Sequence, residues 1–151
     1  MELVRRLDGH SADIVNEALA AVQRAHLQHY EESGEAATRT RLHALYDLLV
    51  LSLRDKNLVP MLTHAENVAQ ERFKGGFGLG EVQTAFNVLE EALWKFIVRE
   101  LPPEELADAL GQVGTVLGAG KDKLARTYVS LATHAQVPTL NMEALFKGAG
   151  V

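Results

Sequence analysis

The stretch Glu71-Arg72-Phe73-Lys74-Gly75-Gly76-Phe77-Gly78-Leu79-Gly80-Glu81-Val82 decides the fold, because two amphipathic patterns meet in it. Glycine adopts a positive φ without a clash at Cβ, so Gly75 and Gly76 are suited to end the first helix in a left-handed cap. Glu81 falls in the first turn of the next helix, where a carboxylate complements the positive end of the helix dipole. The stretch predicts a tight corner between two helices. Its structural residues are Arg72, Gly76, Phe77, Leu79 and Glu81.

The glycine spacing Gly76-x-Gly78-x-Gly80 also raises the possibility of a phosphate-binding loop. Nucleotide-binding glycine loops follow a strand, and the P-loop ends in Gly-Lys-Ser/Thr. Neither feature is present in this stretch. A helix corner without a ligand is therefore the favoured interpretation.

Outward from the corner, apolar residues recur at three- and four-residue spacing and predict a series of helices. Their expected ranges are about 11–32, 35–56, 59–74, 80–100 and 103–136, with a short helical arm at 2–7 and a short final helix at 139–147. No strand pattern competes with these stripes. We expect an all-α bundle of five to seven helices that forms one domain over residues 1–151.

Two of the expected helices carry excess apolar surface. The helix over 35–56 is apolar nearly all round, which is typical of a central helix or an interface. Four apolar residues lie off the main stripes of the second and fourth helices and are the expected contacts of a homodimer. They are Leu48, Leu51, Val88 and Trp94.

Four glycines interrupt the last long helix, at Gly111, Gly114, Gly118 and Gly120. Each interior glycine costs about 1 kcal/mol of helix stability relative to alanine. We expect either a close approach of another helix or a kink near residues 118–120.

Arg72 lies in the middle of the apolar stripe of the helix over 59–74. A buried arginine is costly unless it is paired, so the guanidinium is expected to pair with a carboxylate or with helix-end carbonyls. Glu81 is the candidate partner across the turn. Alternatively, the stem of Arg72 packs and its head reaches solvent.

Composition excludes several functional classes. The net charge is −5 and the basic residues are scattered, which does not favour nucleic-acid binding. There are no cysteines, so disulfides and thiolate chemistry are excluded. The sequence shows no signal peptide and no run of eighteen apolar residues, so we expect no membrane segment and a cytoplasmic location.

Histidines are the main candidates for chemistry. His26 and His29 could share a helix face and are weak candidates for a metal site, which would need further ligands. His64 is the best placed axial ligand if haem is bound. We expect no haem and no other cofactor. We also expect no catalysis, since no nucleophile–base arrangement can be assembled. A small ligand would be sought in the core between the helices over 35–56 and 80–100.

A set of short motifs runs from Val59 to Ile97. They are Pro60-Met61-Leu62, Glu71-Arg72-Phe73, Gly76-Phe77-x-Leu79-x-Glu81-Val82 and Leu89-x-x-x-Leu93-Trp94. In this pattern the chain resembles the N-terminal domain of RsbR-type proteins, the RsbRD N-terminal family. It departs from that family at Glu90, where the family has an arginine.

The resemblance implies a globin-like fold that generally lacks haem and a signal-input role in a bacterial stress-response regulator. It also implies dimerisation and an output partner such as a STAS-domain protein or a histidine kinase. No output domain is present within these 151 residues, so we expect a free-standing member or an excised input domain. Two other functions stay open, namely a haem- or small-ligand-binding globin-type sensor and a structural dimerisation module without a ligand.

Overall fold

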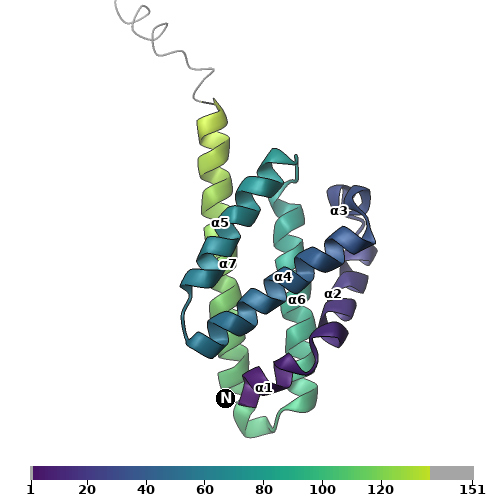
Figure 1. Cartoon of the computed structure of the whole chain (residues 1–151), viewed down its shortest axis with the longest axis vertical. Helices are drawn as coiled ribbons and strands as arrows, with labels where there is room; N and C mark the ends of the chain where they lie inside the picture. The colour runs from purple at the N-terminus through teal and green to yellow at the C-terminus, as the bar shows by residue number, and fades with distance from the viewer. Residues whose placement is uncertain (1, 137–151) are drawn as a thin grey trace, which may run out of the picture.

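Seven α-helices make up residues 2–136, the part of the chain that the computed structural model describes (Figure 1). They are α1 (Glu2–Asp8), α2 (Ser11–Ala25), α3 (Gln28–Ser33), α4 (Glu35–Asp55), α5 (Val59–Lys74), α6 (Leu79–Glu100) and α7 (Pro103–Gln136). This part of the chain contains no strand, and the predicted all-α bundle is confirmed. The helix expected at 139–147 lies outside the described residues.

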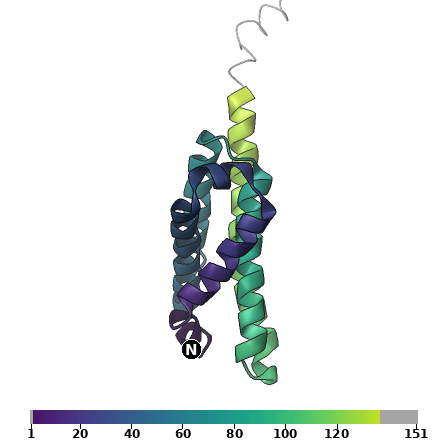
Figure 2. The same ribbon diagram turned by 90° about the vertical axis from the view of Figure 1, so that its right-hand side faces the viewer.

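The helices form two layers. In Figure 2, α4 and α5 lie on one side of the molecule, α6 and α7 lie on the other, and α2 crosses between them. The most extensive packing joins α5 to α7 and α2 to α6, and α4 contacts every other helix. This central place explains why the sequence of α4 is apolar nearly all round.

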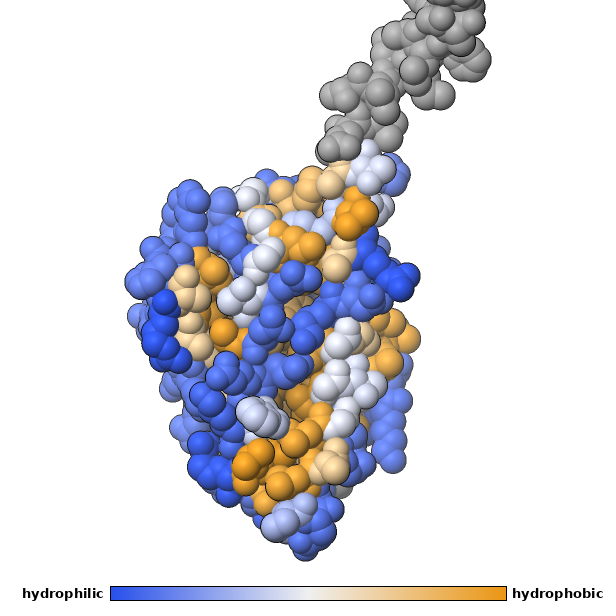
Figure 3. Space-filling view, turned by 180° about the vertical axis from the view of Figure 1, so that it is seen from behind, coloured by the Kyte–Doolittle hydropathy of each residue, from blue (hydrophilic) through white to orange (hydrophobic). Residues whose placement is uncertain are grey.

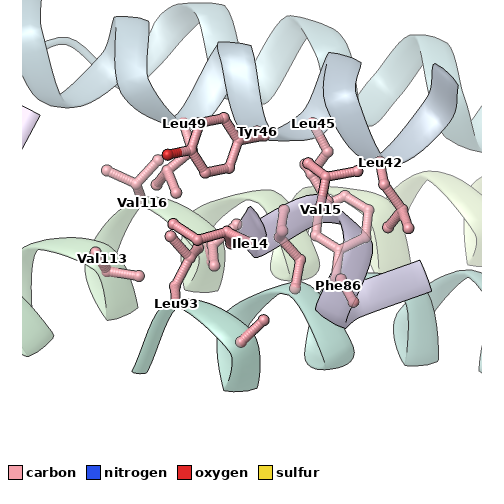
Figure 4. Close-up of a cluster of buried hydrophobic side chains, with 14 of the residues drawn as sticks. Ile14, Val15, Leu42, Leu45, Tyr46, Leu49, Phe86, Leu93, Val113 and Val116 are labelled. Atoms are coloured by element: carbon pink, nitrogen blue, oxygen red, sulfur yellow. The ribbon is translucent and has the colours of Figure 1, made fainter. Parts of the chain in front are cut away.

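The core is built from side chains of α2, α4, α6 and α7 that interdigitate between the layers (Figure 4). Ile14 and Leu49 are among its fully buried members, and each such side chain contributes about 1.5–3 kcal/mol by leaving water. The hydroxyl of the buried Tyr46 donates to the carbonyl oxygen of Leu7 at 2.5 Å. This bond ties α1 to α4, so residues 2–8 are a packed helix rather than a loose arm.

The helix predicted over 11–32 is interrupted at His26, and that prediction was wrong in this respect. His26 adopts a left-handed backbone with a φ of 51°, and Leu27 is extended, so the chain turns before α3 begins at Gln28. The turn buries Tyr30 and brings His29 to the far end of the molecule, next to the α5–α6 corner. Tertiary contacts of α3 therefore override the helical pattern of the sequence.

The glycines of α7 do not break it, and the kink expected near 118–120 is absent from the helix Pro103–Gln136. A Cβ added to Gly120 would lie 2.9 Å from Met61 Sδ and 3.1 Å from Phe86 Cε2. A Cβ at Gly111, Gly114 or Gly118 would meet open space. Close helix approach thus explains one glycine of the four.

These contacts predict that glycine-to-alanine substitution changes the free energy of unfolding in opposite directions at two sites of α7. Gly120→Ala should lower the free energy of unfolding by about 1–3 kcal/mol, because the fully buried Met61 cannot move aside freely. Gly114→Ala should raise it by up to about 1 kcal/mol, because alanine favours the helix and meets nothing. Urea denaturation of both variants measures the difference. Equal stability of the Gly120 variant and the parent would show that Met61 yields at no cost.

No helix within residues 2–136 combines the length and the apolar character needed to cross a membrane.

Candidate functional site

The α5–α6 corner closes α5 with a left-handed glycine. Gly75 stays right-handed, while Gly76 has a φ of 82°. The amide of Gly76 donates to the carbonyl of Phe73 at 3.1 Å, and the amide of Phe77 donates to the carbonyl of Arg72 at 2.9 Å. This pair of bonds is the Schellman arrangement, which satisfies the last carbonyls of α5 and points Phe77 back toward the helix.

Glu81 joins the start of α6 to α3. Its carboxylate accepts from the backbone amide of His29 at 2.9 Å, from His29 Nδ1 at 2.7 Å and from the backbone amide of Gly78 at 2.8 Å. Burial opposes its ionisation, but the hydrogen bonds from His29 and Gly78 outweigh burial and hold the pKa of Glu81 below its usual value. The ionised carboxylate therefore fastens two segments that are far apart in the sequence.

Glu81→Gln should lower the free energy of unfolding by about 2 kcal/mol at pH 7, because an amide cannot accept all three bonds. The folded-state pKa is depressed, so this stabilisation is complete above the ordinary value of about 4.5 and is lost as the pH falls through the folded-state pKa. Denaturation at pH 7 and below pH 4 measures both effects. Glu104→Gln, in the exposed first turn of α7, is the matched control. An equal loss of unfolding free energy in both variants would show that Glu81 acts only through its charge at the start of a helix.

Phe77 is the centre of the corner. Its ring contacts the rings of His29 and Tyr30, each at a centroid distance of 5.1 Å. Arg41 Cζ lies 5.3 Å from the ring centroid and Arg72 Cζ lies 5.7 Å from it. The backbone carbonyl of Phe77 also accepts a hydrogen bond from a side chain of α7, the hydroxyl of Tyr128, at 3.1 Å. Side chains of α3, α4 and α5 thus meet at one half-buried ring, and α7 bonds the backbone of the same residue.

Arg72 is 5% exposed, and the Tyr30 hydroxyl and the Phe77 ring lie beside its guanidinium. Its Nη1 donates to Glu71 at 2.6 Å, but the side chain of Glu71 is 70% exposed. Its buried Nε has no hydrogen-bond partner among the described residues. The expected pairing with Glu81 was wrong, because the carboxylate of Glu81 is bound to His29 and Gly78 instead.

A small cavity of about 20 Å³ lies behind the corner, between α4, α5 and α6. This is the part of the core in which the sequence placed any small ligand. Its lining residues are Tyr30, Arg41, Leu42, Leu45, His64, Val68, Arg72, Val82, Ala85 and Phe86. Buried Nη1 of Arg41 has no hydrogen-bond partner within residues 2–136. The cavity therefore combines an apolar wall with two arginines.

The ionisable groups of the cavity respond to burial. Burial and then the charge of Arg72 lower the pKa of His64 below its usual value, so its imidazole is neutral at pH 7. Burial, followed by the charge of Arg72, also lowers the pKa of Arg41. Burial raises the pKa of the Tyr30 hydroxyl, and the charge of Arg72 opposes that rise. Arg72 thus acts on every other titratable group in the lining.

The two candidate metal ligands do not come together. His26 is exposed and its Nδ1 lies 3.0 Å from Glu31, whereas the Nδ1 of His29 faces Glu81. Within the described residues, no group of three or more histidine, cysteine, aspartate or glutamate side chains is arranged to hold a metal ion.

The candidate dimer contacts differ in exposure. Leu48 and Val88 pack partly against the core, while Leu51 is 37% exposed and Trp94 is 52% exposed. Trp94 borders a groove of about 400 Å³ between α6 and α7. The back of the molecule shows a group of apolar residues toward its lower end, surrounded by hydrophilic ones (Figure 3).

Three contacts of the corner were not predicted from the sequence, those of Tyr30, Arg41 and Tyr128. Arg41 had a signal, because it lies four residues before Leu45 on the stripe of α4. Tyr30 had none, because its burial depends on the break at His26.

One comparison with known proteins identifies a family. A family model described as the RsbT co-antagonist protein rsbRD N-terminal domain matches residues 8–136, which include the corner and the cavity. No curated protein and no solved structure matches the chain significantly.

Proposed function

Since the chain belongs to the RsbT co-antagonist protein rsbRD N-terminal domain family, we propose that it is a non-catalytic signal-input domain of a bacterial stress-response regulator. The match over residues 8–136 is the observation that carries this proposal, and it confirms the resemblance identified from the corner motifs. The proposal includes a single domain over residues 1–151, a globin-like helical path and a cytoplasmic location. Its partners are the RsbT of the family description and a STAS-domain or kinase output module.

The arrangement of α7 supports an input role. An input domain must couple a site to an element that partners can sense, and α7 runs without a break from the lower end of the molecule past the corner (Figure 1). Tyr128 of α7 bonds the corner through the Phe77 carbonyl, and its ring lies 5.7 Å from that of Phe73. A change at the corner would therefore act directly on α7.

This function can be tested by measuring the stress response of the source bacterium. Deletion of residues 8–136 should change the induction of stress-response transcription, and tagged protein should co-purify with RsbT or a STAS-domain regulator. Tyr128→Phe, which removes only the hydroxyl bond to Phe77, should shift the response, whereas Arg24→Gln on the exposed surface of α2 should not. A normal response in the deletion strain, together with no association, would overturn the proposal.

A haem-free domain is part of the proposal. The cavity beside His64 measures about 20 Å³, while pockets for ligands of drug size measure about 300–1,000 Å³. This difference supports a form without haem. Titration with haemin should therefore give no sharp Soret band. A band that His64→Ala abolishes would promote the haem-binding alternative.

We also propose a homodimer that uses the exposed side chain of Trp94. Trp94→Glu should weaken association at least tenfold in light scattering across a concentration series, because a charge would be buried at the interface. Leu51→Glu, on α4 in the other layer, distinguishes the two candidate faces. A parent protein that stays monomeric at high concentration would remove the dimer.

A further inference from the structure

We propose that the cavity between α4, α5 and α6 binds a small monovalent anion, a halide ion or the end of a carboxylate, through Arg41 and Arg72. This binding site goes beyond the proposed input function, because it needs neither a partner protein nor an output.

Two buried donors lack partners at this cavity. Nε of Arg72 and Nη1 of Arg41 are both shielded from solvent, and neither makes a hydrogen bond within the described residues. Both arginines line the cavity. A buried charged donor without an acceptor is strongly unfavourable, and native proteins usually satisfy such groups with a protein atom, a water or an ion.

The charge of the cavity wall is positive. Its lining contains two guanidinium groups and no carboxylate. Arg72 has one ion pair, to the exposed Glu71 outside the lining, and Arg41 forms none among residues 2–136. The face of the Phe77 ring contacts both guanidinium groups, which offsets part of their repulsion but supplies no hydrogen-bond acceptor. An anion would satisfy the donors and the charge together.

The size of the cavity selects the anion. A volume of about 20 Å³ admits one water-sized occupant. A halide ion or a single carboxylate oxygen comes closest to this volume, whereas the four oxygens of sulfate or phosphate exceed it much further. Arg41 and His64 are only half buried, so the outer wall of the cavity consists of side chains that can move to admit an ion.

His64 offers a local reporter of occupancy. The charges of Arg72 and Glu71 on α5 act on it, and Arg41 of α4 and Tyr30 of α3 line the same cavity. An anion between the arginines would offset the positive charge that disfavours the imidazolium. The pKa of His64 should therefore rise when the site is filled.

The test uses the full chain in sodium methanesulfonate at constant ionic strength, because a tetrahedral sulfonate, like sulfate, exceeds the cavity. Methanesulfonate is then replaced stepwise by bromide, chloride or formate. The imidazole NMR signals of His64 should shift along a saturating curve, and the melting temperature should rise with the same half-saturating concentration. Sodium sulfate at equal ionic strength should produce no saturating shift of the His64 signals, and any rise in melting temperature that it causes by exclusion from the protein surface should not saturate.

Two variants assign the effect to the cavity. Arg72→Met keeps the apolar stem, and Arg41→Gln keeps a polar group at the half-buried wall; each should raise the half-saturating bromide concentration at least tenfold. Arg24→Gln removes a charge from an exposed residue of α2 and should leave the half-saturating bromide concentration unchanged. Linear shifts of equal size in all variants, or an equal response to sulfate, would overturn the proposal and leave water as the occupant.

Discussion

Replacing Arg72 with alanine should lower the free energy of unfolding by about 3 kcal/mol, while methionine at the same position should leave stability unchanged or raise it. Alanine removes the stem that packs in the α5 stripe and the guanidinium that lies over Phe77. Methionine keeps most of the stem and removes a buried charge whose Nε has no partner and whose one carboxylate partner is exposed.

Urea denaturation in the absence of small anions measures the three free energies, and calorimetry should show a fall of about 6–12 °C in melting temperature for alanine. Lys74→Ala removes a positive charge from an exposed residue of α5, two positions from Arg72, and is the control for the change in helix charge. If methionine destabilised the fold as much as alanine, the Arg72–Glu71 pair would be a net stabilising contact.

Phe77→Ala should lower the free energy of unfolding by about 3 kcal/mol, because the ring contacts side chains of three helices, α3, α4 and α5, at the corner. Phe77→Leu should lower it less, since leucine fills most of the volume but has no π-face for the arginines. A double-mutant cycle of Phe77→Leu with Arg72→Met isolates the cation–π term, expected at about 0.5–2 kcal/mol. Phe73→Leu is the control, because within residues 2–136 its ring packs edge-on against Tyr128 and lies under no arginine. A coupling energy of zero would mean that the ring acts through its volume alone.

The helical part of the fold could be predicted because its signals are local. The range Val59–Lys74 was predicted with the ends that α5 has, since Pro60 marks its start and Gly75-Gly76 mark its end. The break at His26 could not be predicted, because histidine enters the left-handed region more often than most residues but still only rarely. Its reason is the contact of α3 with Glu81, a residue more than fifty positions away.

The candidate site could be predicted only in part, for the same reason. The burial of Arg72 could be predicted from the apolar stripe of its helix. Its partner could not be predicted, because the position of α3 decides whether His29 or Arg72 binds Glu81. The cavity depends on how three helices leave a gap between them, which no periodicity records. The partial burial of Arg41 could be predicted from its place one turn before Leu45. Its role at the cavity could not, because that role depends on Arg72, whose Nε also lacks a partner.

Trp94 is the single tryptophan of the chain and is 52% exposed on α6. Its fluorescence therefore reports on the surface rather than on the core. The native emission should already be close to that of indole in water, so unfolding should change it little, and circular dichroism is the better optical probe of stability. Docking of any molecule on this face would dehydrate the indole and move its emission to shorter wavelength. The chain thus carries a built-in spectroscopic label for assembly on α6, with no added dye.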